Sequence, residues 1–428
     1  MHMKQYILLL AVLTMGMVSC KKDYTNPNAP TDSQVFSTVD GLTKAVVGIK
    51  QRWAVNGVGV SSLYQAISAA GLSTGELTVL NAGNADLAQL QNGGTNLAPN
   101  NGVLNSFWTT ANIVNSEATK IIANVGVISD VNYRNAVQAY AHLYKALAIG
   151  TMAQFWERVP VTPGANATFS TRAEALAAAT KLLDDAAALI GTTPLPAAFL
   201  SQVGSEIDVR NTLIALAARF YIMSGSSDLA LARASAVNLA SRSVYFYNTL
   251  NPNPVYRSSL ITNNVYGVVA NFGLTGALAP AANDARIAFY TVRNATNGSG
   301  FFRDDATAIP IFLPGEMLLI QAEAHARSNN LASAVSALNQ VLTKTTDAFS
   351  LGAAQPAYSG ANTQVAILQE IYRNRCMELY MSGMKLEDSR RFGRPGPGQA
   401  GAERTRNFYP YPQQERDGNP NTPNDPAN

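Results

Sequence analysis

Two distant stretches of the chain share one pattern of small and apolar residues. Residues 215–230 read ALAARFYIMSGSSDLA, and residues 319–332 read LIQAEAHARSNNLA. Each has alanines at helical spacing, then a short polar turn and a Leu-Ala pair, which predicts two helices joined as a hairpin. Alanine at the crossing points lets the two helices approach closely. Repeated hairpins of this kind, over 209–243 and 316–344, are expected to stack into a curved frame.

Further helices are expected before the first hairpin. Apolar residues at helical spacing predict them, and Thr171 with Glu174 forms a capping box that opens the last of them. The predicted ranges are 39–53, 107–125, 134–155 and 171–190. The fold class is therefore all-α: tetratricopeptide-like helical hairpins form a curved frame, which carries irregular loop-rich inserts and an extended C-terminal tail.

Two segments, 55–105 and 245–309, differ from this frame. They are rich in Gly, Asn and Thr and carry no long period. A short helix is expected at 62–70, a long loop at 81–102 and a small hairpin around 265–270. Loops of such length in a compact domain are usually functional or disordered. The two segments are therefore the expected positions of a binding site.

The stretch from Ile371 to Asn421 carries the most specific pattern. It is predicted to begin as a helix, to turn at Gly383 and to continue as a charged helix. It then becomes an extended tail, because Pro410 and Pro412 do not fit a helix. Charged residues expected to pair between its turns are Arg375, Glu378, Asp388 and Arg390.

This order of fragments resembles the C-terminal signature of the SusD/RagB family of outer-membrane lipoproteins, in which an ER..EL helix is followed by EG.R..DLRR.G and then YPIP..E...NPN. The matching positions are Arg375, Glu378, Leu379, Gly383, Asp388, Arg391, Gly393, Tyr409, Pro410, Pro412, Glu415 and the Asn-Pro-Asn at 419–421. The departures are Asn374, Ser382, Lys385 and Ser389. They replace ion-pairing and packing residues, so they concern the local salt bridges more than the fold.

The first residues carry a targeting signal. An apolar run at 6–18 follows Lys4 and is shorter than the roughly 20 residues that span a bilayer. It ends in Met-Val-Ser-Cys at 17–20, which resembles a bacterial lipobox and implies cleavage before Cys20 and acylation of Cys20. An ordinary signal peptide with an incidental Cys20 is the alternative. The chain is thus divided into a signal peptide (1–19), a lipidated tether (20–38) and a single SusD-like helical domain (39–428).

The loop-rich segments supply the side chains that a sugar site uses. Sugar rings present apolar C–H faces between hydroxyl edges, so aromatic rings suit their faces, and amide or carboxylate groups suit their edges. Loops on a rigid frame are where such sites commonly lie. By side-chain type, the candidate ligand-binding residues are Tyr64, Asn81, Asp86, Tyr256, Tyr266, Phe272, Tyr290 and Phe301.

Several other function classes find little support. The net charge is only +3, and no basic stripe is present, which argues against nucleic-acid binding. Beyond the signal peptide, His142 and His325 stand alone, so no metal site or cofactor is predicted. The Asp304–Asp305 pair does not match a calcium-binding loop, and the sequence leaves open whether a structural Ca²⁺ binds there. Neither a G-x-S-x-G motif nor a P-loop occurs, and the chain is not expected to be an enzyme.

The resemblance implies a cell-surface, outer-membrane protein held by lipid alone. It implies that the protein binds a nutrient, an oligosaccharide above all, and delivers it to a SusC-like TonB-dependent transporter. A surface glycoside hydrolase is one alternative, because hydrolysis needs only two carboxylates. The loop carboxylates available for it are Glu76, Asp86, Asp304 and Asp305. A peptide-binding protein, or a helical scaffold without a small ligand, is another.

Overall fold

The computed structural model describes residues 31–427 except 56, 58, 82, 261–264 and 292–298. The predicted signal peptide and Cys20 lie outside the described residues. The α-helices are α2 (Asp32–Phe36), α3 (Val39–Ala54), α4 (Ser62–Ser73), α5 (Ala85–Asn92), α6 (Gly102–Asn124), α7 (Val131–Phe155), α8 (Arg172–Ile190), α9 (Ala197–Val203), α10 (Val209–Met223), α11 (Ser227–Ser235), α12 (Ala285–Thr291), α13 (Pro314–Arg327), α14 (Leu331–Leu342), α15 (Gln364–Glu378), α16 (Lys385–Arg391) and α17 (Gln413–Gly418).

Short single-turn helices and short strands accompany them. The single turns are η1 (Gly94–Asn96), η2 (Val125–Val127), η3 (Tyr256–Leu260) and η4 (Gly276–Leu278). The strands form antiparallel pairs: β1 (Leu77–Val79) with β5 (Tyr266–Val268), β2 (Arg158–Val159) with β3 (Ser170–Thr171), and β4 (Val244–Tyr245) with β6 (Ile309–Pro310).

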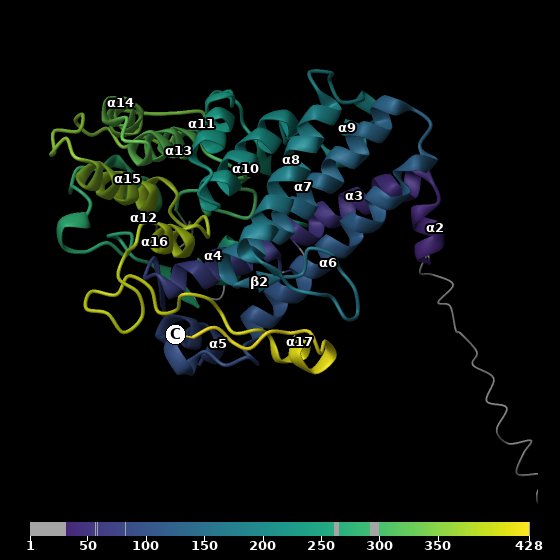
Figure 1. Cartoon of the computed structure of the whole chain (residues 1–428), viewed down its shortest axis with the longest axis horizontal. Helices are drawn as coiled ribbons and strands as arrows, with labels where there is room; N and C mark the ends of the chain where they lie inside the picture. Colours follow the sequence, from purple (N-terminus) through teal and green to yellow (C-terminus); the bar gives the residue numbers. More distant parts are fainter. Residues whose placement is uncertain are drawn as a thin grey trace, which may run out of the picture.

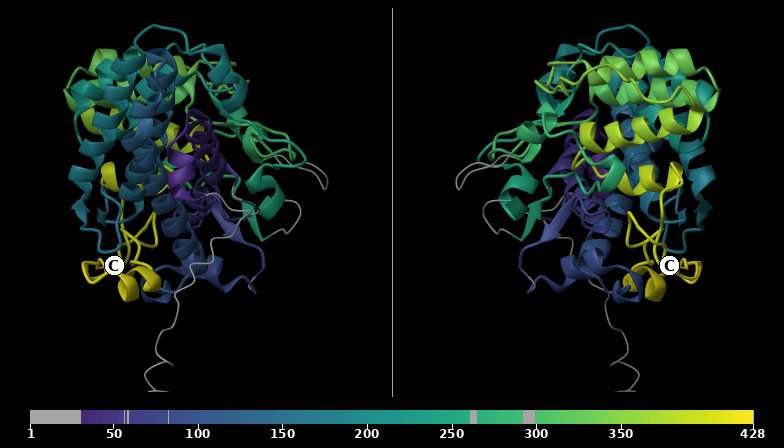
Figure 2. Two further views of the ribbon diagram at one scale, coloured as in Figure 1. Left: turned by 90° about the vertical axis from the view of Figure 1, so that its right-hand side faces the viewer. Right: turned by 90° about the vertical axis from the view of Figure 1, so that its left-hand side faces the viewer.

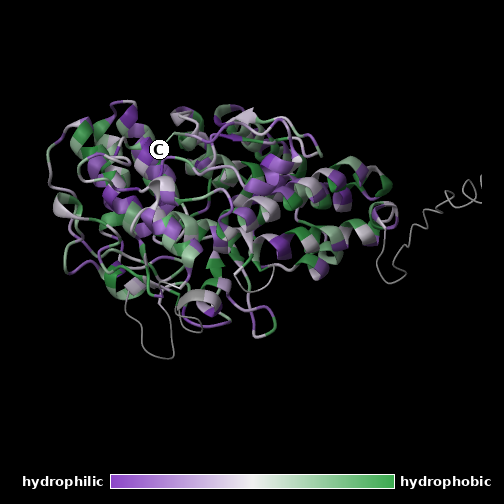
Figure 3. Ribbon diagram, turned by 90° about the horizontal axis from the view of Figure 1, so that it is seen from below, coloured by the Kyte–Doolittle hydropathy of each residue, from purple (hydrophilic) through white to green (hydrophobic). Residues whose placement is uncertain are grey.

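The helices stack in one continuous series (Figure 1). Contacts run from α6 to α7, from α7 to α8, and on through α10, α11 and α13 to α14, with α15 against α13 and α14. Seen from below, the helices carry a mixture of apolar and polar residues (Figure 3). The predicted all-α frame of stacked hairpins is confirmed. Within the described ranges, none of the helices combines the length and the apolarity that a bilayer crossing requires.

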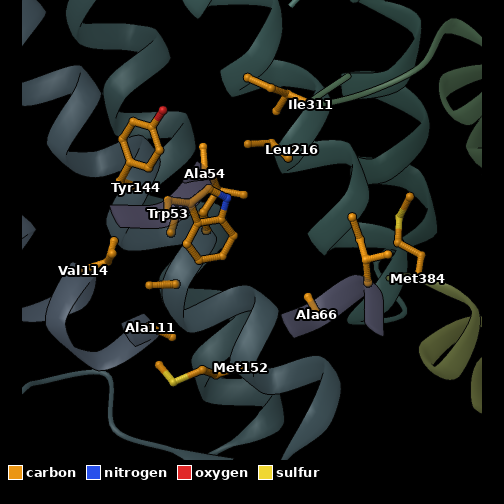
Figure 4. Packing of buried hydrophobic residues seen from close by; sticks show 14 of the residues in the cluster. Trp53, Ala54, Ala66, Ala111, Val114, Tyr144, Met152, Leu216, Ile311 and Met384 are labelled. Carbon is orange, nitrogen blue, oxygen red and sulfur yellow. The ribbon is translucent and has the colours of Figure 1, made fainter. Parts of the chain in front are cut away.

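The core lies where α3 enters the stack. Trp53 of α3 is buried among Tyr144 of α7 and Leu216 of α10 (Figure 4). Trp108 of α6 is also buried, so Trp53 and Trp108 both belong to the core. Gly150 of α7 permits a close approach in the same core, because a Cβ at this position would lie 2.4 Å from the Phe220 ring of α10.

The second helix of the first hairpin is shorter than predicted. It ends at Ser235 rather than near residue 243. Beyond it, the chain bonds to the start of α10: the Asn238 N–H donates to the side-chain oxygen of Asn211 at 2.9 Å, and the Ser241 hydroxyl donates to Asp208 at 2.7 Å. Such side chains compete with the helical hydrogen bonds of the backbone, so the helix ends early.

The expected long loop at 81–102 also contains a helix, α5. Leu87 and Leu90 bury one side of it. Asn101 then fixes the following turn, because its amide donates to the backbone oxygen of Asp86 at 2.9 Å and to Gln89 at 3.0 Å. The prediction of a purely irregular loop was wrong, since two leucines are enough to dock a short helix on the core.

The C-terminal stretch forms the predicted helix, turn and helix as α15 and α16. Arg375 and Asp388 pair as expected at 2.9 Å, with both side chains buried. Glu378 instead pairs outside the stretch, with Arg286 of α12 at 3.3 Å and with Lys344 after α14. Partners of Glu378 lie far away in sequence, which is why spacing within the stretch did not identify them.

The side chains at all four departures from the family signature have hydrogen-bond partners in the structure. Asn374 accepts a hydrogen bond from Arg286 at 2.9 Å, and the ammonium of Lys385 donates to the Phe272 carbonyl at 2.6 Å. Ser382 and Ser389 donate to backbone carbonyls within their own turns. The departures therefore change which groups pair and leave the helices in place.

The tail after α16 covers the ends of α4 and α7. The Tyr409 hydroxyl donates to the Ala69 carbonyl at 2.8 Å, and the Trp156 indole donates to the Pro410 carbonyl at 3.0 Å. Figure 1 shows this tail running beneath the stack to α17. Residues 409–412 are extended as predicted, but the tail then forms the helix α17, which was not predicted.

Substitution of Gly150 by alanine tests the close helix contact. Alanine favours a helix by about 1 kcal/mol over glycine, but a Cβ here would strike the Phe220 ring. We expect Gly150→Ala to lower the free energy of unfolding by about 1–3 kcal/mol, as overpacking does. Gly48→Ala in α3 is the matched control, because a Cβ there meets nothing within 4 Å, and it should stabilise. Urea unfolding of both variants measures the difference, and equal shifts would contradict the contact.

Candidate functional site

The two loop-rich segments meet through a two-stranded sheet. Strand β1, from the first segment, pairs with β5, from the second, so that Leu77 faces Val268 and Val79 faces Tyr266. The hairpin predicted around 265–270 was therefore wrong, because this strand finds its partner almost two hundred residues earlier in the chain. Figure 2 shows the two segments side by side on one flank of the helical frame.

A hollow of about 550 Å³ opens between these segments, and we call it the loop hollow. The polar side chains on its wall come from α4, α5, α6 and η3. They are Gln65, Asn84, Asp86, Ser106 and Ser258, with Tyr64 beside them. Glycines and small apolar residues make up most of the remaining wall, so backbone groups lie close to the space. Two of the predicted ligand residues, Tyr64 and Asp86, thus lie at one hollow.

Two buried polar atoms on this wall lack hydrogen-bond partners in the described part of the chain. They are the side-chain carbonyl oxygen of Gln65 and the hydroxyl of Ser258. The amide of Gln65 donates to the Gly59 carbonyl at 2.6 Å, which fixes the direction of its oxygen. An unsatisfied buried polar group costs about 1–3 kcal/mol. A ligand hydroxyl would remove this cost once a small shift of the surrounding groups exposed either atom to the hollow.

Asp86 is held at the start of α6. Its carboxylate lies so close to Gly102, the first residue of that helix, that a Cβ there would be 2.6 Å from a carboxylate oxygen. The partial positive charge of a helix N-terminus favours a carboxylate at this place. The carboxylate is half-buried and borders the loop hollow, where it is available to a hydroxyl donor.

Most of the aromatic candidates lie in the core beneath the loops. Tyr266, Phe272 and Tyr290 are buried, and Tyr64 nearly so. Tyr64 stacks on Tyr266 with ring centroids 6.5 Å apart, and both Phe272 and Tyr290 pack edge-on against Tyr380. That these rings contact a ligand stays a prediction, and the buried ones would first have to be uncovered. The sequence pattern does not separate an exposed aromatic ring from one that supports a loop.

The remaining candidates are more exposed. Asn81 is exposed and accepts a hydrogen bond from the Gly83 N–H at 2.9 Å, at the entrance to α5. Tyr256 is half-buried at the start of η3. Phe301 is half-buried at a different hollow on the second segment. Gln65 and Ser258 were missed, because a lone Gln on a helix and a lone Ser in an irregular segment carry no signal in the sequence.

The four loop carboxylates considered for hydrolysis are dispersed. Asp86 borders the loop hollow, whereas Asp304 borders the hollow of Phe301. Asp305 pairs with Arg257. Within the described ranges, no group of three or more His, Cys, Asp or Glu side chains is arranged to hold a metal ion.

Glu76, the fourth of these carboxylates, directly precedes β1 and is buried. It lies in the interior, where burial raises its pKa to about 7. The ammonium of Lys385 and the backbone of Met381 lower the pKa by less than burial raises it. The backbone carbonyl of Glu76 accepts a hydrogen bond from the Tyr380 hydroxyl at 2.7 Å, which fixes the residue beneath β1. Glu76 is therefore a buried structural group that takes up a proton near neutral pH.

The pKa of Glu76 predicts a pH-dependent stability. The folded-state pKa lies above the ordinary value of 4.5, so the folded protein binds the extra proton between about pH 4.5 and 7. Its free energy of unfolding should fall by about 3 kcal/mol as the pH rises through this range. Glu76→Gln should remove that part of the pH dependence, as measured by urea unfolding at pH 5 and pH 8. The exposed Glu157→Gln is the control, and an unchanged slope in Glu76→Gln would refute the assignment.

Comparison with known proteins identifies a family and solved structures that this chain resembles. Residues 271–427 match the SusD family in sequence. No curated protein matches the sequence significantly. A SusD-like carbohydrate-binding protein of Bacteroides fragilis has a similar structure, with a TM-score of 0.69 and 14% identity over 90% of this chain and 99% of its own.

Two structures from Bacteroides vulgatus are similar to about the same degree. A SusD-like carbohydrate-binding protein has a TM-score of 0.66 and 14% identity over 83% of this chain and 84% of its own. A SusD superfamily protein has a TM-score of 0.68 and 14% identity over 91% of this chain and 99% of its own. At such identities the likeness concerns the fold. The resemblance seen in the C-terminal sequence is confirmed.

Proposed function

Because residues 271–427 match the SusD family in sequence and the fold is similar to that of SusD-like proteins, we propose that the chain is a member of this family and that it binds a carbohydrate, an oligosaccharide, without cleaving it. The observation that carries this proposal is the loop hollow, where buried polar atoms of two loop segments lie without partners. Similar proteins that are named carbohydrate-binding support the ligand class.

The wall of the loop hollow suits a ligand with many hydroxyl groups. The Gln65 carbonyl oxygen and the Asp86 carboxylate accept hydrogen bonds, while the Asn84 amide and the Ser258 hydroxyl can also donate them. Groups of both kinds are needed because each sugar hydroxyl donates one bond and accepts others. Val103 and Val265 supply apolar contact for C–H groups between these polar positions.

Binding without hydrolysis is favoured by the placement of the carboxylates. A glycosidase needs two carboxyl groups about 5–10 Å apart across the scissile bond. Asp86 is the one loop carboxylate of the four that borders the loop hollow among the described residues, because Asp304 borders another hollow and Asp305 is paired with Arg257. Glu76 is buried beneath β1. The protein is therefore proposed to act through affinity alone.

We further propose that the protein is anchored to the outer membrane by an acylated Cys20 and delivers its ligand to a SusC-like TonB-dependent transporter. The sequence support is the apolar run at 6–18 that ends in Met-Val-Ser-Cys, followed by a tether rich in Asn and Pro. Family membership supports the choice of partner. Globomycin, which blocks lipoprotein signal cleavage, should leave an uncleaved precursor if Cys20 is acylated.

Affinity electrophoresis of the purified protein against a panel of neutral and acidic glycans tests the binding proposal. We expect one glycan to retard the protein without being shortened. Ser258→Ala should weaken that binding about threefold to tenfold, as the loss of one hydrogen bond does. The same substitution should leave the free energy of unfolding unchanged or raise it, because it removes an unsatisfied buried hydroxyl.

Ser201→Ala, on the exposed surface of α9, is the matched control and should change neither binding nor stability. Retardation by none of the glycans would overturn the proposal and favour a peptide ligand or a scaffold role. Shortening of the glycan that depends on Asp86 would indicate a hydrolase instead.

A further inference from the structure

A second hollow, of about 490 Å³, lies on the segment 245–309 where it meets the chain after α14. We call it the arginine hollow and define it by Arg242, Phe289, Phe301, Arg303, Asp304 and Phe349. We propose that the arginine hollow binds a sugar residue that carries a carboxylate, such as a uronic acid. This proposal rests on the proposed carbohydrate binding and adds a class of sugar and a second place for it.

The charge of the hollow favours an anion. Arg242 and Arg303 are both exposed, and neither forms an ion pair within the described residues. The one acidic side chain on the wall, Asp304, is occupied by its own turn: a carboxylate oxygen accepts from the Ala306 N–H and from the Thr307 hydroxyl, both at 2.9 Å. Two guanidinium groups thus face one space with a single carboxylate, which leaves an excess of positive charge.

The aromatic wall favours a ring over a simple ion. Phe289 packs edge-on against Phe301 with centroids 5.2 Å apart, and Phe301 packs edge-on against Phe349 at 6.1 Å. Phe289 and Phe301 are half-buried, so each leaves part of its ring on the wall. An anion without an apolar body would gain nothing from these rings. A sugar acid offers an apolar C–H face next to its carboxylate and uses both features.

The guanidinium of Arg242 is already oriented. Its central carbon lies 5.2 Å from the centroid of the Phe349 ring, in a cation–π contact. Phe349 is fixed in turn, because its N–H donates to Asp347 at 2.8 Å, and Asp347 pairs with Lys344 at 2.6 Å. A stacked guanidinium keeps its N–H edge free, and this edge matches a carboxylate with two parallel hydrogen bonds.

The backbone holds the other side of the hollow in place. Gly300 has a φ of +55°, and a Cβ there would lie 2.7 Å from the Tyr290 ring. Its N–H donates to the Phe289 carbonyl at 2.8 Å, which ties the loop before Phe301 to α12. The Phe301 and Arg303 side chains therefore start from a fixed backbone. A hollow whose groups are positioned before binding loses less conformational entropy on binding.

Isothermal titration of the purified protein with trigalacturonate tests the proposal, and the carboxyl-reduced trisaccharide serves as the matched neutral ligand. We expect the acid to bind at least about tenfold more tightly than its reduced form. Arg242→Gln and Arg303→Gln should each weaken binding of the acid about tenfold, as the loss of a charged hydrogen bond does. Arg242→Lys keeps the positive charge but cannot form the two parallel hydrogen bonds of a guanidinium. It should therefore bind the acid more tightly than Arg242→Gln but less tightly than the unchanged protein.

Arg210→Gln is the control for general charge, because Arg210 is exposed on α10, outside this hollow. Equal binding of acid and reduced sugar, or no binding of the acid, would overturn the proposal. The proposal would also be overturned if the acid bound and neither arginine variant weakened that binding. Arginine-dependent binding of trialanine without binding of trigalacturonate would replace it with a peptide carboxylate.

The outcomes for the two hollows remain separable. If a neutral glycan binds and Ser258→Ala weakens it, the proposed carbohydrate binding stands even when the acid fails. If neither neutral nor acidic sugars bind, both proposals fall. If the acid alone binds and only the arginine variants weaken it, carbohydrate binding stands but belongs to the arginine hollow.

Discussion

The buried carboxylate of Glu378 joins four parts of the chain that are distant in sequence. It pairs with Arg286 of α12 and with Lys344 after α14, and all three side chains are shielded from water. The start of α13 lies against it so closely that a Cβ at Gly315 would be 1.9 Å from a carboxylate oxygen. Removing one partner of a buried pair commonly destabilises a protein by about 3–5 kcal/mol. The C-terminal helix thus anchors the segment 245–309 to the frame.

Both hollows depend on this anchorage. Arg286 fixes α12, and the Tyr290 hydroxyl of the same helix donates to the Glu378 carbonyl at 3.0 Å. Phe289, beside Tyr290, contributes to the arginine hollow, and Gly300 is tied back to Phe289. Strand β5, on the same segment, pairs with β1, and Val265 just before β5 lines the loop hollow. The helical stack therefore carries both hollows: residues of α4, α5 and α6 line most of the loop hollow, and residues outside helices line most of the arginine hollow.

The helical frame could be predicted because the sequence patterns that specify it are local. Alanines at helical spacing, the capping box at Thr171 and the prolines of the tail each act through neighbours in the chain. The candidate site could be predicted only in part. Both segments form hollows, and Tyr64, Asp86 and Phe301 lie at them, while binding of a ligand there stays a prediction. Tyr266, Phe272 and Tyr290 instead support the loops from inside, because an aromatic side chain in an irregular segment serves burial as readily as it serves recognition.

By itself, the sequence determined the helical class, the hairpin repeat and the C-terminal signature, since periodicity and turn chemistry depend on neighbouring residues. Only the tertiary structure decided which distant groups meet. The pairing of β1 with β5, the partners of Glu378, the meeting of Gln65 and Ser258 at the loop hollow and the stacking of Arg242 on Phe349 all join residues from separate segments. Such contacts depend on how the frame folds back on itself, and no local pattern in one sequence encodes them.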